Sequence, residues 1–486
     1  MRRLTLDDLY DFQIPSAPAI SPDGERIAYV VRTTDRSADE DRHHLRLVPT
    51  SGGEPVRLTG GKHDSAPAWS PDGRRVAFLR RGGDGRDQVW VIPVDGGEAE
   101  QLTSLALGAG APQWSHDGAE IAFAAPVASS PLAVSDANTT GSWQDLLTEL
   151  AAKHQVPGAV LGIAHGDELT EAKHGVLNHN TGVDVTTDSL FQIGSITKAW
   201  TATLVMQLVD EGKLALDTPL SHVLPELTLA DPEVTQRLTM RHLLSHTSGI
   251  DGDVITDTGR GDDCLERYVA ELAGVAQNHP LGATMSYCNS GFTLAGRAIE
   301  RLTGETWDTA IAERIFKPLG LTHTVTLPED AIRFRTAHGH VGEPGENPSV
   351  ANTWQLPRSA GPAGLISSTA RDVLTFARIH MSSGHAGSGT RLLAQRSVTA
   401  MREPHVELPG PFSLADAWGL GWGLMNWDGH RLIGHDGGTI GQYAFLRISP
   451  EDDLAVVLLT NGGRASDLYA DLFGSMLITV TPRATR

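Results

Sequence analysis

Cysteine and lysine are both scarce in this sequence of 486 residues. The two cysteines, Cys264 and Cys288, are too few for a disulfide framework or a cysteine-based zinc site, and we expect free thiols rather than a bridge. The chain has no basic stretch, and 59 acidic against 39 basic residues give a net charge of -20. This charge argues against nucleic acid or an anionic membrane as a partner, because the chain offers nothing to neutralise phosphates.

Long apolar runs are also missing. No segment approaches the roughly 18 apolar residues of a membrane span. The first residues, Met1 to Asp8, lack the apolar core of a signal peptide. We therefore expect a cytoplasmic protein that makes no membrane contact. The hydrophobic content of 40% is that of a globular protein, and the length predicts two or three domains.

The first 130 residues contain a repeat. The segment that begins at Ala17 recurs at Ala66 and at Ala111, each time running into Ser-Pro-Asp-Gly or Ser-His-Asp-Gly. A second segment, which begins at Leu47, recurs at Val91 and contains a Gly-Gly pair. Proline presets φ and glycine accepts positive φ, so each unit predicts short strands joined by tight turns. The period of 49 and then 45 residues is that of propeller blades.

This region, residues 1–128, resembles the β-propellers that precede the catalytic domain of prolyl-oligopeptidase-type peptidases, including their start at Leu6–Leu9. Complete propellers have about four to eight blades, whereas two to three are present here, which predicts an incomplete all-β propeller. The chain also has no Gly-x-Ser-x-Gly, so the peptidase chemistry of these relatives does not carry over. We expect the open propeller edge to pack on the second domain or on another copy of the chain in a homo-oligomer.

Residues 129–142 are rich in small and polar residues, which predicts a linker, and residues 143–486 form a second domain. A helix is expected from Trp143 to His154, followed by two paired strands around a turn at Gly166. The multidomain chain therefore combines an all-β region with an α+β domain.

Ser195 and Lys198 lie in a segment of helical periodicity that ends at Gly212. Residues three apart share one face of a helix, so the lysine amine is expected beside the serine hydroxyl. A serine becomes nucleophilic when a neighbouring base takes its proton, and lysine can do so if burial or nearby cations lower its pKa. Taken alone, Ser-x-x-Lys is also common on surface helices.

Two later segments add candidate site residues. Tyr287 and Asn289 lie in a loop before a predicted helix, where a phenol and an amide can point into one cleft. His435 is followed by glycines, at Gly437 and Gly438, in a strand-rich region, which suggests close approach of a ligand to the backbone.

His242 and His246 are spaced like two ligands of a helical metal site. No glutamate lies between them and no third ligand is nearby in the sequence, so we interpret both histidines as structural. We expect neither a metal nor a cofactor.

The order Ser195-x-x-Lys198, Tyr287-x-Asn289 and His435-x-Gly437 resembles the three motifs of the penicillin-recognising serine hydrolases. These are class C β-lactamases, D-alanyl-D-alanine carboxypeptidases, D-aminopeptidases and related esterases. The resemblance covers roughly residues 143–480 and includes Pro362–Thr369. It implies an antiparallel sheet flanked by helices, a helical subdomain, and a cleft between them.

The resemblance also implies a role for each residue. Ser195 would carry the acyl group, and either Lys198 would take its proton or Tyr287 would do so as a phenolate. Asn289 would hold the lysine and the substrate amide. Backbone N–H groups of Ser195 and Gly438 would bind the oxyanion.

One motif departs from the class C form, in which lysine is usual where His435 stands. Histidine is largely neutral at pH 7, and Asp436 adds negative charge. We therefore expect an esterase or a D-amino-acid peptidase or amidase, rather than a β-lactamase or D,D-carboxypeptidase. The substrate would be a small-molecule ester, amide or lactam. The alternative is a non-catalytic scaffold that binds partners through its blades, and the intact set of Ser195, Lys198 and Tyr287 favours the enzyme.

Overall fold

A computed structural model describes residues 12–36, 40–82, 85–105, 108–124, 140–342, 347–385, 389–408, 415–427 and 429–476. The chain divides into two compact units, Met1–Ser130 and Pro131–Arg486. Residues 129–139 of the predicted linker and the Leu6–Leu9 segment lie outside the described residues.

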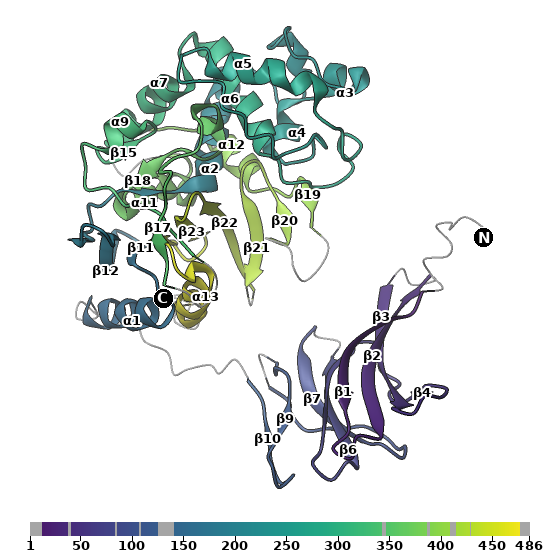
Figure 1. Cartoon of the computed structure of the whole chain (residues 1–486). Helices are drawn as coiled ribbons and strands as arrows, with labels where there is room; N and C mark the ends of the chain where they lie inside the picture. The colour runs from purple at the N-terminus through teal and green to yellow at the C-terminus, as the bar shows by residue number, and fades with distance from the viewer. Residues whose placement is uncertain are drawn as a thin grey trace, which may run out of the picture. The chain divides into compact units, whose positions relative to one another are not determined.

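The first unit consists of antiparallel sheets that follow the sequence repeat (Figure 1). Two sheets have four strands in sequential order, and a third is a hairpin. The strands are β1 Ile14–Ile20, β2 Arg26–Asp35, β3 Glu40–Pro49 and β4 Val56–Arg57; β5 Asp64–Trp69, β6 Arg75–Arg81, β7 Asp87–Pro93 and β8 Glu100–Gln101; and β9 Gln113–Trp114 with β10 Ile121–Ala122. They form blade 1, blade 2 and the start of blade 3. The predicted incomplete propeller is confirmed.

The same contact joins each blade to the next. A tryptophan of the later blade donates its indole N–H to a main-chain carbonyl of the earlier blade, and an arginine of the earlier blade lies over the same indole. These contacts are Trp69 to Ala19 (2.9 Å) and Trp114 to Ala68 (3.1 Å), with Arg26 5.4 Å and Arg75 4.7 Å from the respective ring centres. The tryptophan of the repeat therefore holds consecutive blades in register.

The second unit is built on a nine-stranded antiparallel sheet in the order β13-β12-β11-β24-β23-β22-β21-β20-β19. Its first strands lie beside its last, because β11 pairs with both β12 and β24. The bounds are β11 Gly158–His165, β12 Glu168–Asn178, β13 Val183–Asp184, β19 Val406–Glu407, β20 Ala417–Trp418, β21 Gly423–Trp427, β22 His430–Gly438, β23 Tyr443–Ser449 and β24 Leu454–Thr460. The remaining short strands are β14 Phe191–Gln192, β15 Thr324–Val325, β16 His340–Val341, β17 Ser349–Val350 and β18 Ser367–Ser368.

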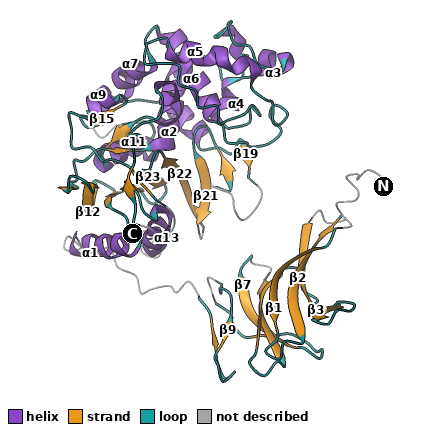
Figure 2. Ribbon diagram, viewed as in Figure 1, coloured by secondary structure: helices purple, strands orange, loops and turns teal. Residues whose placement is uncertain are grey.

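Helices cover both faces of this sheet (Figure 2). Helices α1 (Thr140–Lys153) and α13 (Ala465–Met476) pack on one face, and α11 (Ala370–Met381) packs on the other. The helical part consists of α2 Thr197–Asp210, α3 Pro232–Arg237, α4 Met240–Leu244, α5 Cys264–Glu271, α6 Asn289–Thr303, α7 Trp307–Ile311, α8 Lys317–Leu319, α9 Pro328–Ala331, α10 Gly361–Gly364 and α12 Gln395–Met401. The predicted α+β domain with a helical subdomain is confirmed. Within the described residues, no helix combines the length and the apolar character needed to cross a membrane.

Helix α2 is the centre of the helical part. Its residues from Thr197 to Leu208 are all buried, so its polar side chains face protein as its apolar side chains do. Helices α6 and α10 pack against it. Gly296 of α6 permits this close packing, because a Cβ at that position would lie 2.1 Å from Cγ of Pro362 in α10.

Replacing Gly296 with alanine tests this packing. The added methyl group cannot fit without moving α10, and overpacking of this kind costs about 1–3 kcal/mol. We expect G296A to lower the melting temperature of the second unit in calorimetry. The control is G274A, because a Cβ at Gly274 has no neighbour within 4 Å. Equal melting temperatures for both variants would contradict the proposed contact.

Candidate active site

Ser195 and Lys198 lie where strand β14 leads into helix α2. Ser195 is in a single 3₁₀ turn, Gly194–Ile196, and Lys198 is in the first turn of α2. The Lys198 Nζ donates to Ser195 Oγ at 2.9 Å and to the main-chain carbonyl of Ala363, in α10, at 2.8 Å. The amine is therefore oriented toward the hydroxyl by a second, fixed acceptor.

Lys198 is completely buried. Burial lowers the pKa of its amine to about 7, against weaker opposing effects of Cys288 and Asp253. No ion pair involves Lys198 in the described part of the chain. The nearest aromatic faces are those of Tyr287 and Phe292, whose ring centres lie 4.9 and 5.8 Å from Nζ. An amine in this setting is largely uncharged slightly above neutral pH.

Tyr287 approaches the same serine from the loop before helix α6. Its hydroxyl forms a hydrogen bond with Ser195, and burial nevertheless raises the pKa of the phenol well above its ordinary value. Tyr287 is therefore protonated at neutral pH, and it can donate a proton.

Asn289 is the first residue of α6, and its side-chain amide donates to Asp253 Oδ1 at 3.0 Å. The acceptor that holds Lys198 is instead the carbonyl of Ala363. Sequence reasoning missed this contact, because a main-chain carbonyl leaves no signal in residue type.

The third motif lies on β22, directly against the serine turn. A Cβ at Gly437 would lie 1.9 Å from the Ile193 carbonyl oxygen, and a Cβ at Gly194 would lie 2.6 Å from the Gly438 nitrogen. Only glycine allows two backbones to approach this closely. The absence of these side chains lets the backbone around Ser195 lie against the backbone of Gly437 and Gly438.

His435 lies on β22 as well, with its ring centre 6.2 Å from that of Tyr287. Burial lowers the pKa of His435 to about 3, and Lys198 acts in the same direction when its amine is protonated. The ring Nδ1 lies 2.7 Å from the carbonyl oxygen of Asp436. A carbonyl only accepts, so Nδ1 carries the proton and Nε2 is the acceptor.

The negative charge that the sequence analysis assigned to this position is neutralised. The Asp436 carboxylate forms a two-point ion pair with Arg447 on β23, with distances of 2.5 and 3.2 Å. Burial, and not Asp436, therefore determines that His435 is neutral.

His246 holds the backbone on both sides of Tyr287. Its Nδ1 accepts from the N–H of Cys288 at 2.9 Å, and its carbonyl accepts from the N–H of Ser286 at 2.8 Å. Its ring stacks on the Tyr287 ring at 4.3 Å and 24°. The φ of His246 is +57°, a conformation that costs energy for a residue other than glycine. The sequence analysis interpreted this residue as structural, and the geometry specifies what it holds.

A pocket of about 300 Å³ opens beside this cluster. It adjoins β22 from Gly434 to Gly438 and is otherwise mostly aromatic or apolar. The lining side chains that the cluster does not contain are Trp418, Met425, Tyr443, Phe445 and Ser466. Tyr287 and His435 line the pocket and Ser195 does not, so the pocket can hold an apolar substituent of a substrate beside those two side chains.

Comparisons with known proteins agree with this geometry. A family model described as Beta-lactamase matches residues 143–475, and one described as TolB beta propeller domain matches residues 11–159. Penicillin-binding protein 4 of Amycolatopsis lactamdurans is 49% identical over 337 residues, which span 69% of this chain and 88% of that protein.

Two solved structures have the same fold as the second unit. SurE with D-Leu is 31% identical with a TM-score of 0.55, and the match covers 71% of this chain and 78% of SurE. D-amino acid amidase from Ochrobactrum anthropi SV3, complexed with L-phenylalanine amide, is 26% identical with a TM-score of 0.59, and the match covers 70% and 98%. The sequence prediction of a β-lactamase-related serine hydrolase is confirmed, and the chain belongs to the beta-lactamase family.

Proposed function

We propose that the second unit hydrolyses esters or amides of D-amino acids through an acyl-enzyme on Ser195. The observation that carries this proposal is the fully buried amine of Lys198, which lies 2.9 Å from the serine oxygen and whose pKa is lowered by burial to about 7. An amine with an ordinary pKa near 10.4 would be protonated at pH 7 and could not act as a base.

In the acylation step, Lys198 accepts the proton of Ser195 while Oγ attacks the substrate carbonyl carbon. The Ala363 carbonyl keeps Nζ directed at Oγ and stabilises the ammonium group that forms. The raised pKa of Tyr287 argues against a phenolate as the base, so of the two candidates Lys198 takes the proton.

Tyr287 then protonates the leaving group. Its hydroxyl gives a proton to the departing nitrogen or oxygen and recovers one from Lys198, so that the bond to the leaving group breaks as the acyl-enzyme forms. In deacylation a water molecule passes a proton through Tyr287 and Lys198 to Ser195 Oγ. The water oxygen bonds to the acyl carbon and the bond between that carbon and Oγ breaks, which releases the acid and restores the serine hydroxyl. We assign the oxyanion to the N–H groups of Ser195 and Gly438, and each such donor is worth about 2.7–4 kcal/mol. Asn289 would bind the substrate amide.

The proposed substrate class rests on His435. A neutral imidazole with Nε2 as acceptor offers no cation for a free carboxylate, which β-lactams and D-alanyl-D-alanine peptides carry. It suits a neutral ester or amide instead. The D-configuration is proposed from two relatives, SurE with D-Leu and D-amino acid amidase.

Labelling and a substrate panel test the proposal. A fluorophosphonate should form one adduct, on the peptide that contains Ser195, and S195A should form none. We expect D-amino-acid esters and anilides to be turned over faster than their L-forms, nitrocefin or D-Ala-D-Ala. The variant should lose activity by about 10⁴-fold or more, as for other nucleophile deletions. An adduct on another peptide would refute the acyl-enzyme, and faster turnover of nitrocefin would refute only the substrate class.

The pKa of Lys198 predicts a pH profile. The value of kcat/KM for an ester should rise through about pH 7, because only the neutral amine accepts a proton. The folded lysine releases its proton at a lower pH than the unfolded one, so the free energy of unfolding should also increase as the pH rises above 7.

Replacing Lys198 with methionine is the matched variant. K198M keeps an unbranched side chain one atom shorter and removes the buried amine, so the variant should be inactive at every pH and its free energy of unfolding should depend less on pH. An ester pH profile that is flat between about pH 5 and 9 would contradict a base with this pKa.

His246 is proposed to position Tyr287. Three contacts, two to the flanking backbone and one to the ring, come from this single residue. His242, four residues earlier, hydrogen-bonds at its own helix start, where Nδ1 lies 2.8 Å from Thr239 Oγ1. The two histidines therefore make a matched pair for mutation.

We expect H246L to lower kcat by about 10²-fold with little change in KM, because a misplaced general acid fails in the transition state rather than in binding. H246N should recover part of kcat, since asparagine keeps an acceptor and tolerates positive φ. H242A should lower the melting temperature and leave kcat unchanged. If H246L and H242A lost kcat to the same extent when compared at the same folded fraction, His246 would have no specific role in positioning Tyr287.

A further inference from the structure

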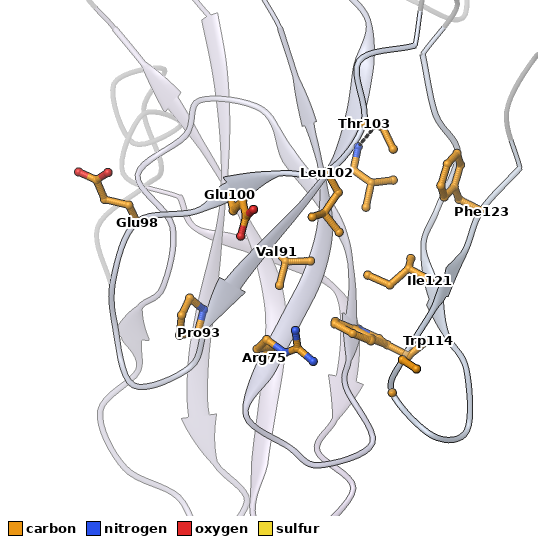
Figure 3. Close-up of a pocket in the computed structure, with 13 residues that line it drawn as sticks. Arg75, Val91, Pro93, Glu98, Glu100, Leu102, Thr103, Trp114, Ile121 and Phe123 are labelled. Atoms are coloured by element: carbon orange, nitrogen blue, oxygen red, sulfur yellow. Dashed lines mark hydrogen bonds between the residues drawn. The ribbon is translucent and has the colours of Figure 1, made fainter.

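The first unit has a groove of about 470 Å³ between blade 2 and the β9–β10 hairpin (Figure 3). Besides Pro93 and Ala119, blade 2 and the hairpin each contribute three apolar side chains to it. These are Val89, Val91 and Leu102 from blade 2, and Trp114, Ile121 and Phe123 from the hairpin.

The repeat indicates what fills the same space between blades 1 and 2. In blade 1, the residues that correspond to Val89, Val91 and Leu102 are Leu45, Leu47 and Leu58. The same hydrogen bond marks the correspondence in both blades, because the N–H of Leu45 donates to the Thr59 hydroxyl and the N–H of Val89 donates to the Thr103 hydroxyl. These leucines share one apolar cluster with three alternate residues of the next blade's third strand, Trp90, Ile92 and Val94. A third strand with alternating apolar residues therefore covers this face of blade 1.

The corresponding position of blade 3 is open in the described part of the chain. There, β10 pairs with β9 and with no further strand. Leu102 is 48% exposed, whereas its counterpart Leu58 is only partly exposed. The groove thus combines an apolar floor with the backbone edge of β10, which can pair with another strand.

The rim of the groove is acidic. Glu98 and Glu100 line it, and neither has an ion pair among the described residues. The positive group in the lining, Arg75, lies over the Trp114 ring. A strand that carries lysine or arginine beside its apolar residues complements this charge.

We propose that this groove binds an extended peptide segment of a partner protein, which adds to β10 as the third strand of blade 3. The segment has apolar side chains at alternate positions and a basic residue facing Glu98 and Glu100. This inference is independent of the proposed hydrolase activity.

Geometry argues against a second copy paired through its own β10. A two-fold axis between antiparallel strands is perpendicular to their sheet, so it keeps both blade 2 sheets on one face of that sheet. The blade 2 sheets of the two copies would then overlap in space.

The test uses the full chain and a fluorescent peptide, Gln-Val-Trp-Val-Ile-Pro-Val-Lys. This is the segment from Gln88 to Val94 in blade 2, with lysine in place of Asp95, because the C-terminal ends of successive third strands lie together and Glu100 pairs with Val91. We expect saturable binding in fluorescence polarisation, and none for the same peptide with serine at the positions of Trp90, Ile92 and Val94. L102R should weaken binding at least tenfold. V56R, at a 67% exposed position on β4, is the control and should bind as the wild type does.

Three results would overturn the proposal. Binding that is absent, or equal for both peptides and all variants, would exclude a specific groove. Sedimentation that changes from dimer to monomer in L102R would assign the groove to a second copy. Peptide binding that appears only after deletion of residues 125–139 would assign it to the chain's own segment. Ester hydrolysis should be unchanged in L102R, which separates this test from that of the active site.

Discussion

The proposed chemistry of this protein depends on a lysine amine that is buried and has no ion pair among the described residues. Taking an ammonium group out of water is costly, and this cost lowers the pKa of the amine to about 7. A carboxylate beside it would restore the charge and remove the base. The acceptors that hold Lys198 are accordingly neutral, the Ser195 hydroxyl and the Ala363 carbonyl. Burial of Lys198 therefore favours reactivity and lowers the stability of the fold, and packing of the surrounding core has to offset this free-energy cost.

Much of that support comes from backbone rather than side chains. Glycines at positions 194 and 437 let the serine turn and β22 meet, and Gly296 lets α10 bring its carbonyl to the lysine. His246 holds the tyrosine loop through its own carbonyl and one ring nitrogen. Each of these contacts fixes a reactive atom to a rigid element, which is what a preorganised site requires.

The sequence predicted the parts of the site that depend on residue type and spacing. The three-residue step from Ser195 to Lys198 is enough to expect two side chains on one face, and the repeat of Asp-Gly turns is enough to expect blades. The Ala363 contact could not be predicted, because any residue has a carbonyl. Nor could the ion pair of Asp436, because Arg447 lies on the neighbouring strand and the sequence does not give strand register.

The order of strands in the large sheet has a consequence for synthesis of the protein. Strand β11, near the start of the second unit, lies between β12 and β24, and Ala159 pairs with Thr460. The ribosome must therefore deliver almost the whole chain before the sheet can close around its first hairpin. The blades, whose contacts are local, can fold much earlier. A nascent or prematurely terminated chain would thus carry folded blades and a hydrolase that has not yet assembled.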